Sequence, residues 1–300
     1  MDKLIVILGP TASGKSDLAV KLARRFYGEI ISADSRQVYK GLDIGSGKIT
    51  KKEMKGVPHH LLDIANPKRR FTVAQYQKLT LKKIKEIQQK DRAPFLVGGT
   101  GFYIQSIVDG IVIPEVKPDW KLREKLESKK VTELYEMLLK LDPERAKNID
   151  AKNPRRLIRA LEIVVSTGKP VPELGSRISQ FNILQIGVKK SPQELKKLIH
   201  KRLKKRITGI ITEVKKLHLP AGRQAKPGLS WKRLEEFGLE YRFTAQYLQG
   251  KLTHQEILDK IQRESEQFAK RQMTWFKRDK RIHWIKTQKE AEKLIKKFLQ

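Results

Sequence analysis

The sequence contains no cysteine. This absence excludes disulfide bonds, thiolate zinc sites and cysteine nucleophiles, although it does not decide the cellular compartment. No apolar run approaches the roughly 20 residues that a membrane-spanning helix needs. The first predicted strand begins at Lys3, which leaves no room for a signal peptide, so we expect a cytoplasmic protein that does not bind membranes.

Acidic residues are also scarce in this chain of 300 residues. The 33 Asp and Glu stand against 65 Lys and Arg, which gives a formal net charge of +32. A charge of this size repels itself in the folded state and exceeds what solubility needs. It therefore favours a polyanionic partner such as a nucleic acid, with a solvated lysine-rich surface as the alternative.

Strand and helix patterns alternate over the first third of the chain. Short continuous apolar runs predict buried strands, and apolar residues at helical spacing predict the helices between them. We expect strands at 4–8, 29–33 and 94–97, and helices from the first glycine-rich segment to Gly28, at 73–90 and at 102–108. This alternation predicts an α/β fold with a parallel sheet flanked by helices.

A mainly helical segment begins at about Pro114, with helices expected at 120–128, 131–141 and 154–167. A strand-like run at 181–188 returns the chain to the sheet. We expect it to be followed by long helices at 191–217 and 253–277, a short strand at 282–285 and a final lysine-rich helix. The chain therefore divides into a predicted core domain, 1–113 plus 180–300, and a helical insertion domain, 114–179.

A phosphate-binding loop lies between the first strand and the first helix. It matches the Walker A pattern with the residues Gly9, Pro10, Thr11, Ala12, Ser13, Gly14, Lys15 and Ser16. The glycines let successive amide hydrogens turn inward, where they form an anion cradle with the helix N-terminus. Lys15 can reach the terminal phosphates and the Ser16 hydroxyl can bind Mg²⁺. The motif and its position predict a P-loop NTPase-like sheet, but they do not decide between a nucleoside triphosphate and another diphosphate.

Two further side chains follow strands of the predicted sheet. Asp34 follows the second strand, and Thr100 follows the third, between Gly99 and Gly101. Because ligands bind at the carboxyl ends of parallel strands, both should lie beside the phosphate loop. Asp34 could act as a general base or cap a turn, and Thr100 could bind a diphosphate oxygen or only shape a turn. No Walker B acid follows the third strand, which argues against a hydrolytic motor but not against a kinase.

Six segments, in this order, resemble bacterial tRNA dimethylallyltransferases, and the resemblance extends from Leu4 to about Trp284. The segments are GPTASGKS (9–16), ISADSRQVYKGLDIGSGK (31–48), HHLLDI (59–64), GGTGFY (98–103), NPRRLIRALE (153–162) and AKRQMTWF (269–276). The resemblance implies transfer of a dimethylallyl group from dimethylallyl diphosphate to the exocyclic amine of the adenosine 3′-adjacent to the anticodon. It implies Mg²⁺ as cofactor, no ATP hydrolysis, release of diphosphate and the tRNA anticodon loop as partner. We expect a monomer.

The resemblance also implies roles for individual residues. Asp34 would be the general base, Thr100 would hold the diphosphate and touch the nucleotide, and Lys15 and Arg206 would bind the diphosphate that leaves. The tRNA contacts would come from Asp34, Ser35, Arg36, Gln37, Thr100, Arg123, Arg155, Arg156, Leu157, Ile158 and Arg159. Taken alone, Arg206 could equally be one more cation on a basic helix.

Several features stay open at this point. The main alternatives are a small-molecule P-loop kinase and an isopentenyltransferase that acts on free adenine nucleotides. The segment 237–242 departs from the family pattern, and 219–227 is predicted to be an added surface loop without chemistry. His59 and His60 are predicted to stabilise a turn rather than to bind a metal. Near the C-terminus, 275–276 are expected to pack in the core, and Arg271 is a candidate contact for the diphosphate or RNA.

Overall fold

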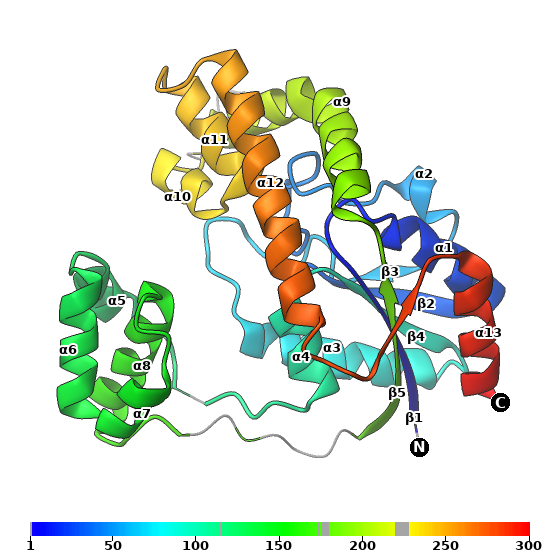
Figure 1. Ribbon diagram of the computed structural model, residues 1–300, viewed down its shortest axis with the longest axis horizontal. Coiled ribbons are helices and arrows are strands. Elements are labelled where there is room, and N and C mark those ends of the chain that lie inside the picture. Colours follow the sequence, from blue (N-terminus) through cyan, green and yellow to red (C-terminus); the bar gives the residue numbers. More distant parts are fainter. Residues whose placement is uncertain (1, 115, 173–174, 176–179, 220–227) are drawn as a thin grey trace. The chain divides into compact units, whose positions relative to one another are not determined.

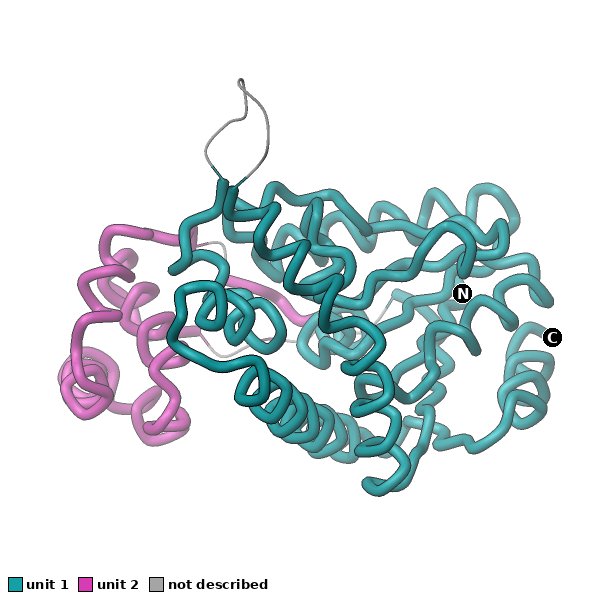
Figure 2. Tube along the Cα trace, turned by 90° about the horizontal axis from the view of Figure 1, so that it is seen from above, with its two compact units in different colours: residues 1–110, 178–300 teal, residues 111–177 magenta. Residues whose placement is uncertain are grey.

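The computed structural model describes residues 2–114, 116–172, 175, 180–219 and 228–300. The chain forms two compact units, unit 1 from 1–110 with 178–300 and unit 2 from 111–177 (Figure 2). Unit 2 differs by two or three residues at each end from the predicted insertion 114–179. The predicted surface loop falls mostly on 220–227, outside the described residues.

Unit 1 is built on a sheet that has six parallel strands in the described part of the chain (Figure 1). Their order across the sheet is β3-β2-β4-β1-β5-β6. The bounds are β1 Asp2–Leu8, β2 Gly28–Ala33, β3 His59–His60, β4 Ala93–Gly98, β5 Phe181–Val188 and β6 Ile282–Ile285. The predicted parallel α/β sheet is confirmed, although the short β3 was not predicted.

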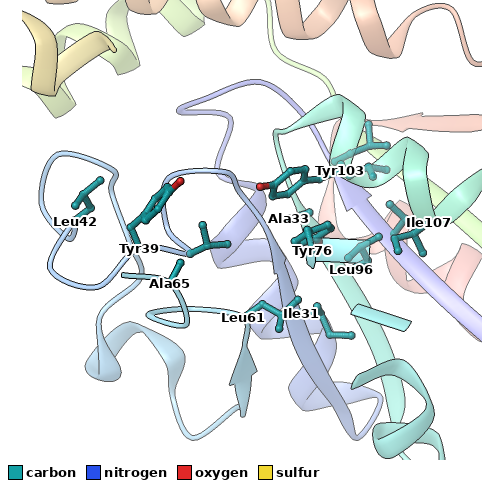
Figure 3. Close-up of a cluster of buried hydrophobic side chains, with 14 of the residues drawn as sticks. Ile31, Ala33, Tyr39, Leu42, Leu61, Ala65, Tyr76, Leu96, Tyr103 and Ile107 are labelled. Atoms are coloured by element: carbon teal, nitrogen blue, oxygen red, sulfur yellow. The ribbon is translucent and has the colours of Figure 1, made fainter. Parts of the chain in front are cut away.

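Both faces of the sheet are buried, as the continuous apolar strands require. Leu4, Val6 and Leu8 of β1 face one core, while Ile5 and Ile7 face a second core on the other side. Figure 3 shows the first core, where β2 and β4 pack against aromatic rings from the helices. The rings of Tyr76 and Tyr103 stack there with centroids 3.9 Å apart.

Helices cover this sheet. In chain order, those of unit 1 are α1 Lys15–Arg25, α2 Lys51–Met54, α3 Val73–Gln88, α4 Gly101–Val108, α9 Pro192–His218, α10 Trp231–Glu236, α11 Leu239–Leu248, α12 His254–Phe276 and α13 Gln288–Leu299. The predicted cap of α9 is present, because Ser191 Oγ accepts the Glu194 amide and Glu194 accepts the Ser191 amide. The predicted packing of 275–276 is also found, since Phe276 is 3% exposed and Trp275 packs on the same core.

Unit 2 contains the helices α5 Trp120–Glu127, α6 Val131–Leu141, α7 Pro143–Asn148 and α8 Pro154–Thr167. They enclose their own apolar core, which includes Leu126, Leu134, Leu138 and Leu161. A hydrophobic core of its own is typical of a compact unit that packs separately from the rest of the chain. In neither unit does a described helix have the length and apolarity to cross a membrane.

Candidate active site

Three strands of unit 1 end at the same level of the sheet. Gly98 at the end of β4 pairs with Leu8 on β1 and with Ala33 on β2. The phosphate loop (Gly9–Ser16), Asp34 and Thr100 follow these strands directly, so all three leave the sheet at one edge. This edge is where parallel α/β proteins bind their ligands.

The phosphate loop has the backbone of an anion site. Gly14 has a φ of +84°, which favours glycine, and α1 begins at the next residue. The loop is closed by the Ser13 amide, which donates to Pro10 O at 3.3 Å. The Ser13 hydroxyl is buried and has no hydrogen-bond partner among the described residues. The amides at the start of α1 therefore offer the positive end of a helix to a ligand.

Lys15 lies half-buried within this loop, and its ammonium group donates to Pro10 O at 3.1 Å. Burial, opposed by the Asp34 carboxylate and assisted by the charge of Arg202, lowers the pKa of Lys15 to about 8. A bound anion would favour the charged form. A phosphate ligand would therefore supply negative charge next to the Lys15 ammonium group.

Asp34 and Thr100 are tied together through Ser35. Asp34 Oδ1 accepts the amides of Arg36 at 2.8 Å and Gln37 at 3.3 Å, which is the turn-capping role considered above. Thr100 Oγ1 accepts the Ser35 amide at 3.0 Å. The other oxygen, Asp34 Oδ2, accepts no hydrogen bond from the described residues. One carboxylate oxygen thus fixes the turn, and the other remains available for a proton-bearing ligand.

The other residues of this turn are held by neighbouring loops. The Gln37 amide group donates to Gly47 O at 3.2 Å. The Arg36 guanidinium lies over the Phe237 ring, 6.0 Å from its centroid. The predicted tRNA-contacting segment 34–37 is therefore held in place at the sheet edge, and its contact with tRNA stays a prediction.

Of two neighbouring arginines on α9, Arg202 reaches the phosphate loop and Arg206 lies beside it. Arg202 Nη1 lies 3.4 Å from Thr11 Oγ1. A Cβ placed on Gly47 would lie 1.6 Å from Arg202 Nη2 and 3.1 Å from Arg206 Nη1, so glycine makes room for both side chains. Burial and the neighbouring Arg202 lower the pKa of Arg206 to about 10. Arg206 Nη2 is buried without a hydrogen-bond partner in the described part of the chain. A buried cationic donor of this kind favours the binding of an anion.

Glu213, also on α9, holds the loop that carries Gly47. Its carboxylate accepts the amides of Asp43 at 3.0 Å, Ile44 at 2.5 Å and Gly45 at 3.0 Å, and also the Tyr241 hydroxyl at 2.8 Å. This cluster joins the loop, α9 and α11. Sequence reasoning missed Glu213 and Arg202, because their partners lie far away along the chain. The one sequence signal was the i,i+4 spacing of Arg202 and Arg206 on a predicted helix.

Glu240 is an acid near these arginines. Burial raises the pKa of its carboxyl, although the charges of Arg206 and Arg202 oppose the shift and Asp34 adds to it. Glu240 belongs to the segment 237–242 that departs from the family pattern. Its charge in turn raises the pKa of Arg206 and opposes the effect of burial there.

In unit 2, two of the predicted tRNA contacts form an internal ion-pair network. Arg123 donates to the fully buried Glu162 through Nε at 2.7 Å and Nη2 at 2.6 Å, and Arg159 also pairs with Glu162. Burial raises the pKa of Glu162, but the hydrogen bonds from Arg123, Arg159 and the Asp119 amide outweigh it, so the pKa lies below its ordinary value. Arg123 and Arg159 thus have a structural role, and the i,i+3 spacing of Arg159 and Glu162 was the available signal.

The remaining positions of the NPRRLIRALE segment (153–162) divide by exposure. Leu157 and Ile158 are 0% and 7% exposed and pack in the core of unit 2. The apolar face of α8 is covered by this core, and the tRNA contact predicted at Leu157 and Ile158 stays a prediction. Arg155 and Arg156 are exposed, and their tRNA contact stays a prediction.

The histidine pair and Arg271 have simpler surroundings. His60 Nε2 lies 2.6 Å from the buried carboxylate of Glu29, which Arg92 also contacts at 3.0 Å. His59 Nδ1 lies 2.8 Å from Val57 O. These contacts hold the short strand β3 in place.

Arg271 is exposed on α12, and its neighbour Gln272 points into the site instead.

Comparison with known proteins identifies relatives over nearly the whole chain. The family model for IPP transferase matches residues 37–279. A tRNA dimethylallyltransferase of Carboxydothermus hydrogenoformans is 42% identical, with 99% of this chain and 96% of that protein covered. One from Halalkalibacterium halodurans is 40% identical, with 95% and 91% covered.

Solved structures of proteins with related names are similar to this chain in both fold and sequence. The full-length tRNA isopentenylpyrophosphate transferase of Bacillus halodurans has a TM-score of 0.72 and 37% identity, covering 100% of this chain and 97% of its own. A eukaryotic dimethylallyltransferase, described as acting on tRNA, has a TM-score of 0.75 and 27% identity, covering 92% of this chain and 70% of its own. Both the sequence and the fold are therefore similar to one family.

Proposed function

Since this chain belongs to the IPP transferase family, whose relatives are named tRNA dimethylallyltransferases, we propose that it prenylates tRNA. The proposed reaction moves a dimethylallyl group from dimethylallyl diphosphate to the exocyclic amine of the adenosine next to the anticodon on its 3′ side. The allylic C–O bond breaks, a C–N bond forms, diphosphate leaves and the amine loses a proton. The observation that carries the proposal is the group of three cations, Lys15, Arg202 and Arg206, at a phosphate loop beside Asp34.

The donor diphosphate would bind to the phosphate loop. Its charge grows as the allylic C–O bond breaks, and fixed cations lower the energy of this developing charge. Lys15 reaches the loop from within, and Arg206 supplies a buried Nη2 that lacks a partner among the described residues. Arg202 lies at the Thr11 side of the loop. These groups are already in place and need little reorganisation to receive the leaving group.

The acceptor amine would approach Asp34. Oδ1 is held by two amides of the following turn, so the carboxylate has a fixed direction. Oδ2 can orient the amine and take its proton as the C–N bond forms. Thr100 Oγ1 accepts the Ser35 amide at 3.0 Å and donates to Ser35 Oγ over a long 3.5 Å, a contact that its hydroxyl would exchange for the diphosphate or the nucleotide. Asp34 would be the general base, and Thr100 would align the two substrates.

Mg²⁺ fits this loop through Ser16. The Ser16 side chain is exposed at the start of α1, and no group of three acidic or histidine side chains occurs among the described residues that could form an all-protein metal cage. Magnesium commonly uses one or two protein ligands together with water and substrate phosphates. Ser16 would supply the protein ligand, and the metal would neutralise charge on the leaving diphosphate. Asp34, Lys15 and the arginines act independently of that contribution.

The tRNA would bind through the segment 34–37 of unit 1 and through Arg155 and Arg156 of unit 2. A base must leave its stack to reach a catalytic group inside a protein site, so the target adenosine would be extruded from the anticodon loop. We infer that the protein works as a monomer in the cytoplasm. Neither a small-molecule kinase nor a transferase acting on free nucleotides is favoured by the names of its relatives.

The reaction can be tested with labelled donors. Dimethylallyl diphosphate labelled in its prenyl group, together with tRNA from cells that lack this modification, should give labelled adenosine in the RNA. ATP labelled in its γ-phosphate should transfer no label to RNA or to small acceptors. Transfer from ATP alone would establish the kinase, and prenylation of AMP but not of tRNA would establish the free-nucleotide enzyme.

A further inference from the structure

Gln272 of α12 lies between two of the loops that form the site. The Thr11 amide donates to its Oε1 at 2.8 Å, and its Nε2 donates to Gly99 O at 2.8 Å. The side chain is 7% exposed, so these two bonds satisfy a buried amide group. One side chain therefore joins the phosphate loop to the turn that follows β4.

The turn is shaped to admit this side chain. A Cβ placed on Gly99 would lie 2.4 Å from Gln272 Nε2, and one on Gly101 would lie 2.5 Å from the Trp275 ring. Gln272 and Trp275 are three residues apart, so they project from the same side of α12. The glycines at 99 and 101 thus allow α12 to press closely on the turn that carries Thr100.

The contact continues from the turn to Asp34. Thr100 follows Gly99 directly, its amide donates to Ala33 O at 3.1 Å, and its Oγ1 accepts the Ser35 amide. A chain of backbone and side-chain hydrogen bonds therefore runs from Thr11 through Gln272 and the Thr100 turn to the residues on either side of Asp34. At one end is the loop proposed to hold the leaving group, and at the other is the proposed base.

We propose that Gln272 is a positioning residue that sets the separation between the donor and acceptor halves of the site. The inference rests on the proposed prenyl transfer. In such a reaction the carbon must lie in line between the amine and the leaving oxygen, and a misplacement of about 1 Å can cost on the order of 100-fold in rate. Gln272 touches neither substrate in this role. Gln272 can fix the distance between the two loops because its Oε1 accepts the Thr11 amide while its Nε2 donates to Gly99 O.

Three variants separate this role from simple packing. Gln272→Met keeps the length of the side chain but removes both hydrogen bonds. Gln272→Glu keeps the acceptor, and it regains a donor only when its carboxyl is protonated. Gln262→Met is the matched control, because Gln262 lies on the same helix and its Nε2 donates to Lys196 O at 3.3 Å, away from the phosphate loop.

We expect Gln272→Met to lower kcat at least about 10-fold and to weaken binding of inorganic pyrophosphate several-fold, with tRNA affinity within about twofold of wild type. The kcat of Gln272→Glu, relative to wild type, should rise as the pH falls from 8.5 to 6, because the protonated carboxyl restores the donor. The same ratio for Gln272→Met should not change with pH. Gln262→Met should behave as wild type in every assay.

Two results would overturn the inference: wild-type kcat and pyrophosphate affinity in Gln272→Met, or a pH-independent ratio in Gln272→Glu. Thermal melting of each variant identifies a folding defect, and if Gln272→Met does not fold, the pH profile of Gln272→Glu carries the test. Failure of the proposed function is distinct, because the wild-type enzyme would then not prenylate tRNA. Pyrophosphate binding would still measure the effect of Gln272 on the phosphate loop in that case.

Discussion

The two units of this protein carry very different charge. Residues 111–177 contain 15 Lys and Arg against 11 Asp and Glu, a net charge of +4. The remaining 50 basic and 22 acidic residues give unit 1 a net charge of +28. The excess positive charge therefore belongs almost entirely to unit 1, although the helical insertion was the region in which the sequence placed most of the tRNA-binding arginines.

The units also use their arginines differently. In unit 2, Arg123 and Arg159 are neutralised by the buried Glu162, an arrangement that stabilises a fold. In unit 1, the guanidinium groups of Arg202 and Arg206 lie side by side near Gly47, and burial together with the charge of Arg202 lowers the pKa of Arg206. Burial and the repulsion between the two like charges cost stability, and the nearby Glu240 and Glu213 offset only part of that cost. An anionic ligand would stabilise both guanidinium groups. The immediate partners of an arginine, rather than its place in a motif, distinguish the two roles.

The largest effect is expected at Asp34. Asp34→Ala removes the proposed base, and kcat should fall by about 10²- to 10⁴-fold. Affinity for tRNA should change little, because the charge that attracts RNA is intact. Single-turnover kinetics and filter binding measure the two quantities separately. If tRNA binding is lost while turnover survives, Asp34 recognises tRNA and is not the general base.

The contrast between the two kinds of arginine predicts opposite stability effects. Arg206→Gln should lower kcat/KM by about 10²- to 10³-fold, as removal of a donor to a developing anion does elsewhere. Its melting temperature should stay the same or rise, because a buried guanidinium group and its repulsion with Arg202 are removed. A lowered melting temperature with normal kcat/KM would make Arg206 a structural residue.

Glu162→Gln is the matching change in unit 2. It leaves Arg123 and Arg159 without their shared carboxylate, and the free energy of unfolding should fall by about 3 kcal/mol. Because the folded-state pKa of Glu162 is lowered, the wild-type ion pairs stabilise unit 2 above the unfolded pKa of about 4.3, and this stability is lost as the pH falls through the folded pKa. Hydrogen exchange of the amides of α5 and α8 between pH 6 and 3 measures both effects. Unchanged exchange would contradict the structural role.

A smaller effect is expected from the exposed arginines of unit 2. The double variant Arg155→Gln, Arg156→Gln should weaken tRNA binding about tenfold and reduce the slope of log affinity against log salt by about 1 to 2. Lys293→Gln with Lys296→Gln on α13 is the control, because both are surface lysines of unit 1 outside the site. If the control pair has the larger effect, unit 1 binds the RNA through its general charge and unit 2 contributes little.

The smallest effect is the pH dependence of donor binding. The lowered pKa of Lys15 means that its charge is present below about 8 and is lost as the pH rises above this value. Affinity for dimethylallyl diphosphate, measured by calorimetry without tRNA, should therefore fall several-fold between pH 7.5 and 9.5. Lys15→Arg should abolish this dependence, because arginine keeps its charge throughout the range. A dependence that persists in Lys15→Arg would come from another group.

The parts of the site that are local in sequence could be predicted. The phosphate loop is a continuous motif with a strand before it and a helix after it, and Asp34 and Thr100 directly follow apolar runs. The roles of Gln272, Arg202 and Glu213 could not be assigned, because the loop residues that they bind lie 168 or more residues away in the chain. The burial of Leu157 and Ile158 within the predicted tRNA-contacting segment was not foreseen, although a helix commonly divides its residues between an apolar and a polar face.

The same distinction holds for the fold. Strands β1, β2, β4 and β5 are mostly buried and rich in apolar residues, so they were predictable. Strand β3 has two residues, and its place depends on pairing with β2 rather than on its own pattern. Helices α2, α7 and α10 have only four to six residues each, too few for helical periodicity to predict them.

The central claim, that unit 1 uses its phosphate loop to release diphosphate during prenyl transfer to tRNA, is tested most directly by the stoichiometry of the products. Wild-type protein, dimethylallyl diphosphate and unmodified tRNA should give one diphosphate for each N6-prenylated adenosine, measured by mass spectrometry of the digested tRNA and an enzymatic diphosphate assay. No orthophosphate should appear when ATP is added. Diphosphate release without modified adenosine, or orthophosphate release that matches ATP consumption, would contradict the account.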